Sequence, residues 1–201
     1  MAKPMDVNSK FNLSTAVVLI IDRNTHSADV VSQILSGFGV HNILRSQRVE
    51  QAHKLLAVNN VDLVIIDPEL EDDDGFEFVR DLRRSAANNH YAPIILVSGH
   101  ARISSIWKAR DCGANFFVAK PITPAVLLQR IYWVAGDHRK FLEEDVGAYV
   151  GPDRRFKREG PPVGSDGRRQ SDLSGELGAQ VAENLSEAAH SDFLKPQKIL
   201  I

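Results

Sequence analysis

The 201-residue chain has little of what marks a secreted or membrane protein. It contains one cysteine, Cys112, so no internal disulfide can form and a reducing compartment is expected. Its longest evident apolar run, residues 16–21, is far shorter than the roughly 20 residues that a membrane-spanning helix needs. Residues 1–14 are mixed and polar, without the apolar core of a signal peptide. These absences predict a cytoplasmic protein with no membrane partner.

The chain also lacks a large excess of either charge. Its net charge is −2, so no overall field attracts it to nucleic acid or to an anionic membrane. Basic residues gather between 154 and 169, but they alternate there with aspartate and glutamate. This mixture favours a solvated segment over a nucleic-acid site. The hydrophobic share of 43% is that of a globular protein with a sizeable core.

Five short apolar runs alternate with segments of helical spacing between residues 16 and 135. Continuous runs such as VVLII, LVII and IILV are typical of parallel strands buried on both faces of a sheet. The five expected strands cover residues 16–21, 42–45, 62–66, 93–97 and 115–118. Five βα units joined by right-handed crossovers predict an α/β fold with an open, doubly wound parallel sheet. The functional crevice of such a sheet lies at the carboxyl ends of its strands.

Two of the expected helices carry clear local signals. The first is expected to place Val30, Ile34, Leu35 and Phe38 on one buried face. In the last, Thr123 is expected to cap the helix and Pro124 to occupy its first position, where the missing N–H costs nothing.

The composition changes after about residue 147, where glycine and proline become frequent and core-forming side chains become rare. Such a stretch cannot bury enough apolar surface to offset the entropy of ordering it. Leu177, Val181 and Leu185 form an apolar stripe compatible with a short helix, which would need a partner. We therefore divide the chain into an N-terminal extension (1–14), a folded domain (15–140), a flexible linker (141–175) and a tail (176–201).

Polar side chains stand where four of the five expected strands end. Asp22 follows the first strand, Asp67 the third, Ser98 the fourth and Lys120 the fifth. Because parallel strands end at one edge of the sheet, two carboxylates, a hydroxyl and an ammonium should converge there. Together with a hard divalent cation such as Mg²⁺, this set suits phosphoryl transfer to a carboxylate.

The segments around these four residues resemble the receiver domain of two-component response regulators. They are VLIIDRN (18–24), DLVIIDPELEDDDGFEFVRDLR (62–83), PIILVSG (93–99) and CGANFFVAKP (112–121). The resemblance extends over roughly residues 16–135. It implies a flavodoxin-like (βα)5 fold with strand order 2-1-3-4-5 and a role in phosphorelay signal transduction.

The resemblance also implies a role for each site residue. Asp67 would be the phosphoacceptor, and Mg²⁺ would be held by Asp22, Asp67 and the backbone carbonyl of Glu69. Ser98 and Lys120 would bind the phosphoryl group.

The chain departs from the family pattern at Arg23, which stands where a second acid is usual. This exchange removes a carboxylate and adds a positive charge, so weakened Mg²⁺ binding is expected. The aromatic residue that switches in the family corresponds to Phe117, which lacks a hydroxyl, and a cis peptide is implied before Pro121. Trp107 and Trp133 are candidates for a surface that faces a partner.

The leading interpretation is a receiver that accepts a phosphoryl group from a histidine kinase or phosphotransfer protein on Asp67. It would signal through contacts with a downstream protein, with homodimer formation left open. Beyond phosphorylation and dephosphorylation of its own Asp67, we expect no enzyme activity. The alternative that Arg23 favours is a pseudo-receiver, a protein-binding module that needs no phosphorylation.

Two other interpretations are weaker. A flavin-binding protein of the same topology is disfavoured because the loop at residues 22–25 lacks glycine and has too few hydroxyls to cradle a phosphate. Nucleic-acid binding through the arginine-containing tail is disfavoured by the alternating charges.

Overall fold

The computed structural model describes residues 13–70, 73–85, 88–137, 139–143 and 149–153. The elements follow in the order β1 (Val17–Ile21), α1 (Thr25–Gly37), β2 (Asn42–Ser46), α2 (Val49–Val58), β3 (Leu63–Ile66), α3 (Gly75–Arg84), the 3₁₀ helix η1 (Asn88–Tyr91), β4 (Ile94–Ser98), α4 (Ile103–Asp111), β5 (Phe116–Ala119), α5 (Pro124–Ala135), β6 (Phe141–Glu143) and β7 (Val150–Pro152). No helix in these ranges is long and apolar enough to cross a bilayer.

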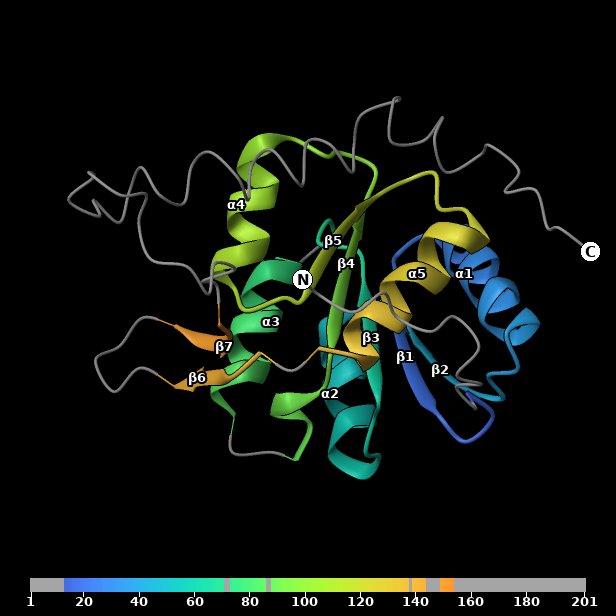
Figure 1. The fold of residues 1–201 in the computed structure, drawn as a ribbon, viewed down its shortest axis with the longest axis horizontal. Coiled ribbons are helices and arrows are strands. Elements are labelled where there is room, and N and C mark those ends of the chain that lie inside the picture. Colours follow the sequence, from blue (N-terminus) through green and yellow to red (C-terminus); the bar gives the residue numbers. More distant parts are fainter. Residues whose placement is uncertain (1–12, 71–72, 86–87, 138, 144–148, 154–201) are drawn as a thin grey trace, which may run out of the picture.

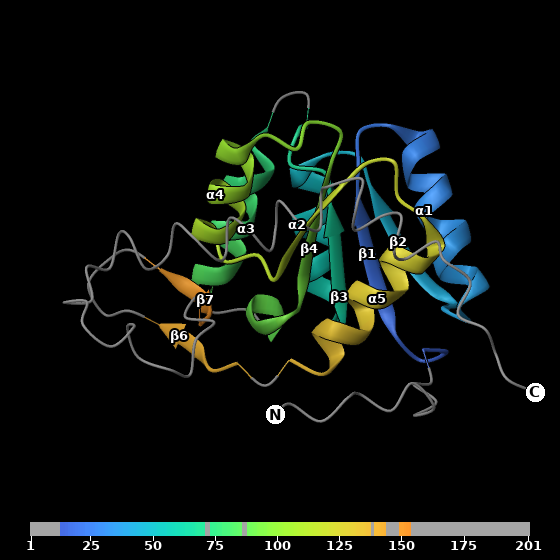
Figure 2. The same cartoon turned by 45° about the horizontal axis from the view of Figure 1, so that its top comes forward.

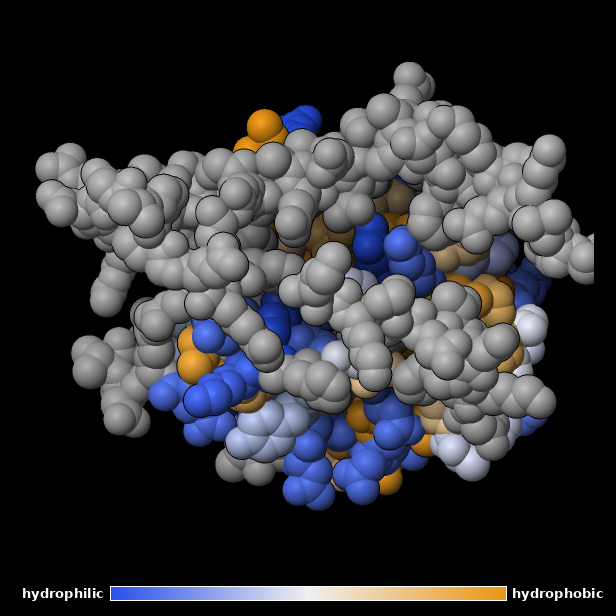
Figure 3. Space-filling model, viewed as in Figure 1, coloured by the Kyte–Doolittle hydropathy of each residue, from blue (hydrophilic) through white to orange (hydrophobic). Residues whose placement is uncertain are grey.

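Five strands form one parallel sheet in the order β2-β1-β3-β4-β5, which confirms the predicted fold. Helices α1 and α5 cover one face, and α2, α3 and α4 cover the other (Figures 1 and 2). Successive residues of β1 alternate between two core clusters, Leu19 and Ile21 on one side and Val18 and Ile20 on the other. The strand runs are continuously apolar because both faces of the sheet are covered. On the molecular face seen in Figure 3, hydrophilic side chains predominate along the lower edge of the described surface.

Side-chain caps fix where three of the helices begin. The Asn24 side chain accepts a hydrogen bond from Ser27 N–H at the start of α1, and Asp74 accepts one from Phe76 N–H at the start of α3. Thr123 accepts one from Val126 N–H, followed by proline in the first turn of α5, as predicted. Each such cap satisfies a backbone donor that the helix itself leaves without a partner.

The predicted core face of α1 is partly wrong. Ala28, Val31 and Leu35 are its buried residues, whereas Val30 is 37% exposed. The buried residues lie three and four positions apart, which is the helical repeat. Val30 lies on the outward side of the helix, although its spacing of four residues from Ile34 had predicted a shared buried face.

The segment predicted as a linker from residue 141 begins with folded structure. Strands β6 and β7 pair antiparallel, with Phe141 opposite Pro152, and β7 lies beside α3 (Figures 1 and 2). Tyr149 is buried, and its hydroxyl donates to the Pro152 carbonyl at 2.6 Å. Strands of three residues are too short to give a periodic sequence signal. The rest of the predicted linker and the helix considered at 176–190 lie outside the described residues.

A buried arginine connects α3 to the elements around this β6–β7 hairpin. Arg83 is 2% exposed. Its Nε donates to the Gly113 carbonyl at 3.0 Å, one Nη donates to the Ala92 carbonyl at 2.7 Å, and the other donates to Asn115 Oδ1 at 3.1 Å. Burial lowers the pKa of Arg83 to about 10, so the guanidinium remains charged at neutral pH. The guanidinium carbon of Arg83 lies 5.4 Å from the centre of the Phe141 ring on β6, within cation–π range.

Two glycines allow β7 to approach the turn between α4 and β5. Gly113 has φ +91°, and a Cβ on it would lie 2.4 Å from the Val150 carbonyl oxygen. A Cβ on Gly151 would lie 2.8 Å from the Gly113 Cα. The two backbones are therefore in direct contact, at a distance that only glycine permits.

Cys112, beside this contact, is expected to be chemically inert in the native protein. It is 1% exposed, its Sγ donates to the Ala109 carbonyl, and burial raises its pKa to about 11. The thiolate is the reactive form, and a pKa of about 11 instead of the ordinary value near 9 lowers the thiolate share at pH 8 about 100-fold, before steric protection is counted. Ellman's reagent at pH 8 should react at least that much more slowly with native than with denatured protein. Similar rates in both states would show that the Cys112 thiol is accessible.

Candidate functional site

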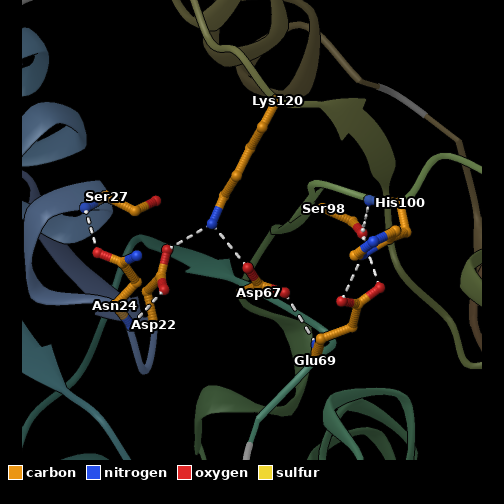
Figure 4. A network of polar contacts seen from close by, with 8 residues as sticks. All are labelled: Asp22, Asn24, Ser27, Asp67, Glu69, Ser98, His100 and Lys120. Atoms are coloured by element: carbon orange, nitrogen blue, oxygen red, sulfur yellow. Dashed lines mark hydrogen bonds and ion pairs between the residues drawn. The ribbon is translucent and has the colours of Figure 1, made fainter.

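The four predicted polar residues come together at the carboxyl edge of the sheet (Figure 4). Asp22 follows β1, Asp67 follows β3, Ser98 ends β4 and Lys120 follows β5. Asp22, Asp67 and Ser98 are all buried, with 4%, 8% and 1% of their surfaces exposed. They lie close together because β1, β3, β4 and β5 are parallel neighbours in the sheet.

Lys120 bridges the two carboxylates. Its Nζ lies 2.8 Å from Asp22 Oδ2 and 2.6 Å from Asp67 Oδ2 (Figure 4). Burial lowers the pKa of Lys120, but the hydrogen bonds to Asp22 and Asp67 outweigh burial, and the net shift is upward. The ammonium is therefore charged at neutral pH, and the three groups together carry one negative charge when both carboxylates are ionised. The Lys120–Pro121 peptide is cis, as the family resemblance implied.

Backbone amides hold the other oxygen of each carboxylate. Asp22 Oδ1 accepts from Asn24 N–H and Asp67 Oδ1 accepts from Glu69 N–H, both at 2.8 Å. Each bond closes a tight turn directly after a strand and orients the carboxylate. The loop after Asp67 also needs Gly75, since a Cβ there would lie 2.7 Å from the Pro68 Cα.

A second polar pair, which sequence reasoning missed, lies on the Ser98 side of the site. His100 Nδ1 lies 2.7 Å from Glu69 Oε2, and Glu69 Oε1 lies 3.5 Å from Ser98 Oγ (Figure 4). Ser98 Oγ also accepts a hydrogen bond from His100 N–H at 2.9 Å. The signal was available, because residues that follow two paired parallel strands are brought together at one edge. Sequence reasoning had considered only the backbone carbonyl of Glu69.

The donor atoms at this edge fit a hard divalent cation that keeps several of its waters. Asp22 Oδ2 and Asp67 Oδ2 both lie within hydrogen-bond distance of one nitrogen atom, so one small ion can touch both. Mg²⁺ is bound in this manner, by one or two carboxylates and few other protein ligands. Within the described part of the chain, no three histidine, cysteine, aspartate or glutamate side chains cluster closely enough to hold a metal. Further acids follow Asp67 on the loop before α3. The Asp74 side chain caps α3, and Asp72 lies outside the described residues.

The remaining predicted residues lie around the site or farther from it. Arg23 is exposed on the loop directly after Asp22, and Phe117 is partly buried against the core under α2, α3 and α4. Trp107 on α4 is half-buried, with the Arg110 guanidinium carbon 4.4 Å from its ring centre. Trp133 on α5 is also half-buried and packs edge-on against Phe116 at 5.1 Å between ring centres. Both tryptophans are thus partly covered by their own chain.

Residues 18–132 match the family model described as the response regulator receiver domain. The KDP operon transcriptional regulatory protein KdpE of Escherichia coli is 30% identical over 114 residues, which are 57% of this chain and 48% of KdpE. Chemotaxis protein CheY1 of Helicobacter pylori J99 is 26% identical over 59% of this chain and 96% of its own. The chain therefore spans about half of a larger regulator and nearly all of a single-domain one.

Among solved structures, the receiver domain of the Pseudomonas aeruginosa sensor histidine kinase PA1611 superposes with a TM-score of 0.54. It is 24% identical, over 60% of this chain and 98% of its own. That structure holds a magnesium ion in its active-site cleft.

Proposed function

Because the chain belongs to the response regulator receiver domain family, we propose that it accepts a phosphoryl group on Asp67 and signals through protein contacts. The observation that carries the proposal is the meeting of Asp67 with Lys120, Asp22 and Ser98 at one buried edge. The donor would be the phosphohistidine of a histidine kinase or phosphotransfer protein in the cytoplasm.

The residues of the site suit this transfer. A carboxylate oxygen of Asp67 would form a bond to phosphorus while the bond from phosphorus to the donor nitrogen breaks. Lys120 would neutralise charge on the phosphoryl oxygens, and the Ser98 hydroxyl would donate a hydrogen bond to one of them. Receiver domains typically bind Mg²⁺, and here Asp22, Asp67 and the Glu69 carbonyl would hold it. When bound, the ion would neutralise further charge on the transferring group.

The proposal is tested by incubating the chain with acetyl phosphate and Mg²⁺ and measuring its intact mass. The wild type should gain the mass of one phosphoryl group, and Asp67→Asn should gain none. Asp73→Asn, on the loop that follows, is the matched control and should behave as the wild type does. A phosphoryl group on Asp67→Asn would refute the assignment of the acceptor.

A second candidate function is a pseudo-receiver that binds partners without phosphorylation, and Arg23 is the observation in its favour. Arg23 is exposed and follows Asp22 directly in the chain, so its positive charge would lie near the expected cation. Two unit charges about 5 Å apart interact by roughly 3 kcal/mol at an effective dielectric of about 20. Exposure and the flexible arginine stem reduce that figure.

Arg23→Asp is therefore expected to bind Mg²⁺ about tenfold more tightly than the wild type, which corresponds to about 1.4 kcal/mol. Calorimetric titration of Mg²⁺ into both proteins measures the difference. Arg84→Asp serves as the control for net charge, because Arg84 is exposed in the last turn of α3, whereas the first turn of that helix is the one beside the loop after Asp67. Equal affinities for wild type and Arg23→Asp would mean that the guanidinium points away from the cation.

We propose that the output surface includes α4 and α5. Ile103 at the start of α4 is 73% exposed, and Trp107 is half-buried on the same helix. Trp133 on α5 would extend this surface. A downstream protein or a second copy of the chain would bind here, because exposed apolar and aromatic side chains are what a partner can bury.

A further inference from the structure

The Glu69–His100 pair lies across the side of the site that the phosphoryl group would have to reach. Glu69 comes from the loop after β3, and His100 comes from the loop after β4, which begins directly after Ser98. The pair therefore connects these two loops next to Ser98 (Figure 4). The side chains of Glu69 and His100 are 41% and 65% exposed, whereas Ser98 beneath them is 1% exposed. The pair is thus exposed to solvent and contacts the buried Ser98 hydroxyl.

Glu69 also competes for the Ser98 hydroxyl. Ser98 Oγ already accepts from His100 N–H, and Glu69 Oε1 lies 3.5 Å from it, which is the long limit for a hydrogen bond from the Ser98 hydroxyl. A serine hydroxyl has one proton to donate. In the proposed reaction that proton must be donated to a phosphoryl oxygen, which would bring a second anionic group next to the Glu69 carboxylate. Glu69 must therefore move away or remain at an electrostatic cost.

We infer that Glu69 and His100 are positioning residues that slow transfer to Asp67 from small anionic phosphodonors. His100 holds the Glu69 carboxylate at Ser98, where it repels the donor and occupies the hydroxyl. This inference rests on the proposed function, since it concerns phosphoryl transfer to Asp67.

The exposure of the pair makes it easy to displace. Exposed polar side-chain pairs are typically worth about 1 kcal/mol or less, so contacts with a docking protein can separate Glu69 from His100. A small donor makes no such contacts and must approach while the carboxylate is in place. The pair would thereby favour a protein donor over metabolites such as acyl phosphates.

The test uses the full chain and acetyl phosphate. In this step the bond from phosphorus to the acetate oxygen breaks, a bond from phosphorus to an Asp67 oxygen forms, and acetate leaves. Initial rates are measured by intact mass for the wild type, Glu69→Gln, His100→Ala and the double variant, at low and at high salt. Glu50→Gln, an exposed glutamate paired with Lys54 on α2, is the matched control.

Glu69→Gln is expected to accept phosphoryl about three- to tenfold faster than the wild type at low salt, since tenfold in rate corresponds to about 1.4 kcal/mol of barrier. High salt should reduce this gain, because screening weakens the repulsion that the substitution removes. His100→Ala, which keeps the backbone bond to Ser98, should give a smaller gain. The two gains should not add in the double variant, and Glu50→Gln should match the wild type.

Equal or lower rates for Glu69→Gln at low salt, beside a phosphorylated wild type, would overturn the inference and leave the proposed function standing. A gain that does not change with salt would also overturn it, since the carboxylate charge would then not be the cause. If neither the wild type nor Glu69→Gln takes up phosphoryl, while both unfold at the same temperature, the proposed function fails and this inference fails with it.

Discussion

Arg83→Met is expected to lower the free energy of unfolding by about 3–5 kcal/mol. The Arg83 guanidinium donates to three backbone carbonyls and to the Asn115 side chain in the interior. Methionine fills part of the volume but donates no hydrogen bond, so these acceptors lose their donor. Each buried polar group left unsatisfied costs about 1–3 kcal/mol, and the costs do not simply add because the site can relax.

The measurement is equilibrium unfolding in urea, with Arg84→Met as the matched control. Arg84 is the next residue in the last turn of α3, but its side chain is exposed. Surface substitutions of this kind usually change stability by less than about 0.5 kcal/mol. If both variants unfold at the same urea concentration as the wild type, Arg83 does not hold α3 to η1 and the start of β5.

Arg83 shows what the sequence could not predict. In the run RDLRR it looks like a solvated residue at a helix end, where basic side chains are common. Its burial depends on acceptors at Ala92, Gly113 and Asn115, which are distant in sequence and meet only in the folded chain. The β6–β7 hairpin could not be predicted either, because its three-residue strands give no periodic signal and its contacts with α3 form only in the folded chain.

The place where the polar residues converge, by contrast, could be predicted well. A doubly wound parallel sheet carries its site at the carboxyl edge, so the polar residues that follow continuous apolar runs identify that edge. Asp22, Asp67, Ser98 and Lys120 were predicted to converge on this basis, and the structure brings them together. What the side chains do once there is less predictable. The Glu69 side chain turns toward Ser98 and His100, a choice set by local hydrogen bonds.

Gly113→Ala is expected to destabilise the protein more than the same change at Gly39, by about 2 kcal/mol or more, the usual cost of overpacking. Gly39 and Gly113 have nearly equal backbone angles, φ +88° and +91°. The strain of placing alanine in this region, about 1–2 kcal/mol, is therefore common to both variants. They differ in their surroundings. An added Cβ at Gly39 meets nothing within 4 Å, whereas at Gly113 it would lie 2.4 Å from the Val150 carbonyl oxygen.

The comparison isolates the contact between β7 and the α4–β5 turn, and two measurements complete it. Urea unfolding gives the difference in stability between Gly113→Ala and Gly39→Ala. Hydrogen exchange of the Val150 and Gly151 amides reports whether the hairpin stays docked. If the protein relieves the clash by releasing the hairpin, exchange there should accelerate in Gly113→Ala alone, and the stability cost then measures the docking energy. If the hairpin stays, exchange is unchanged and the cost is strain within the contact.

Equal stability losses in the two variants, with unchanged exchange in both, would mean that β7 does not press on Gly113 in solution. The hairpin would then lie outside the folded domain, as the sequence had suggested for everything beyond residue 140.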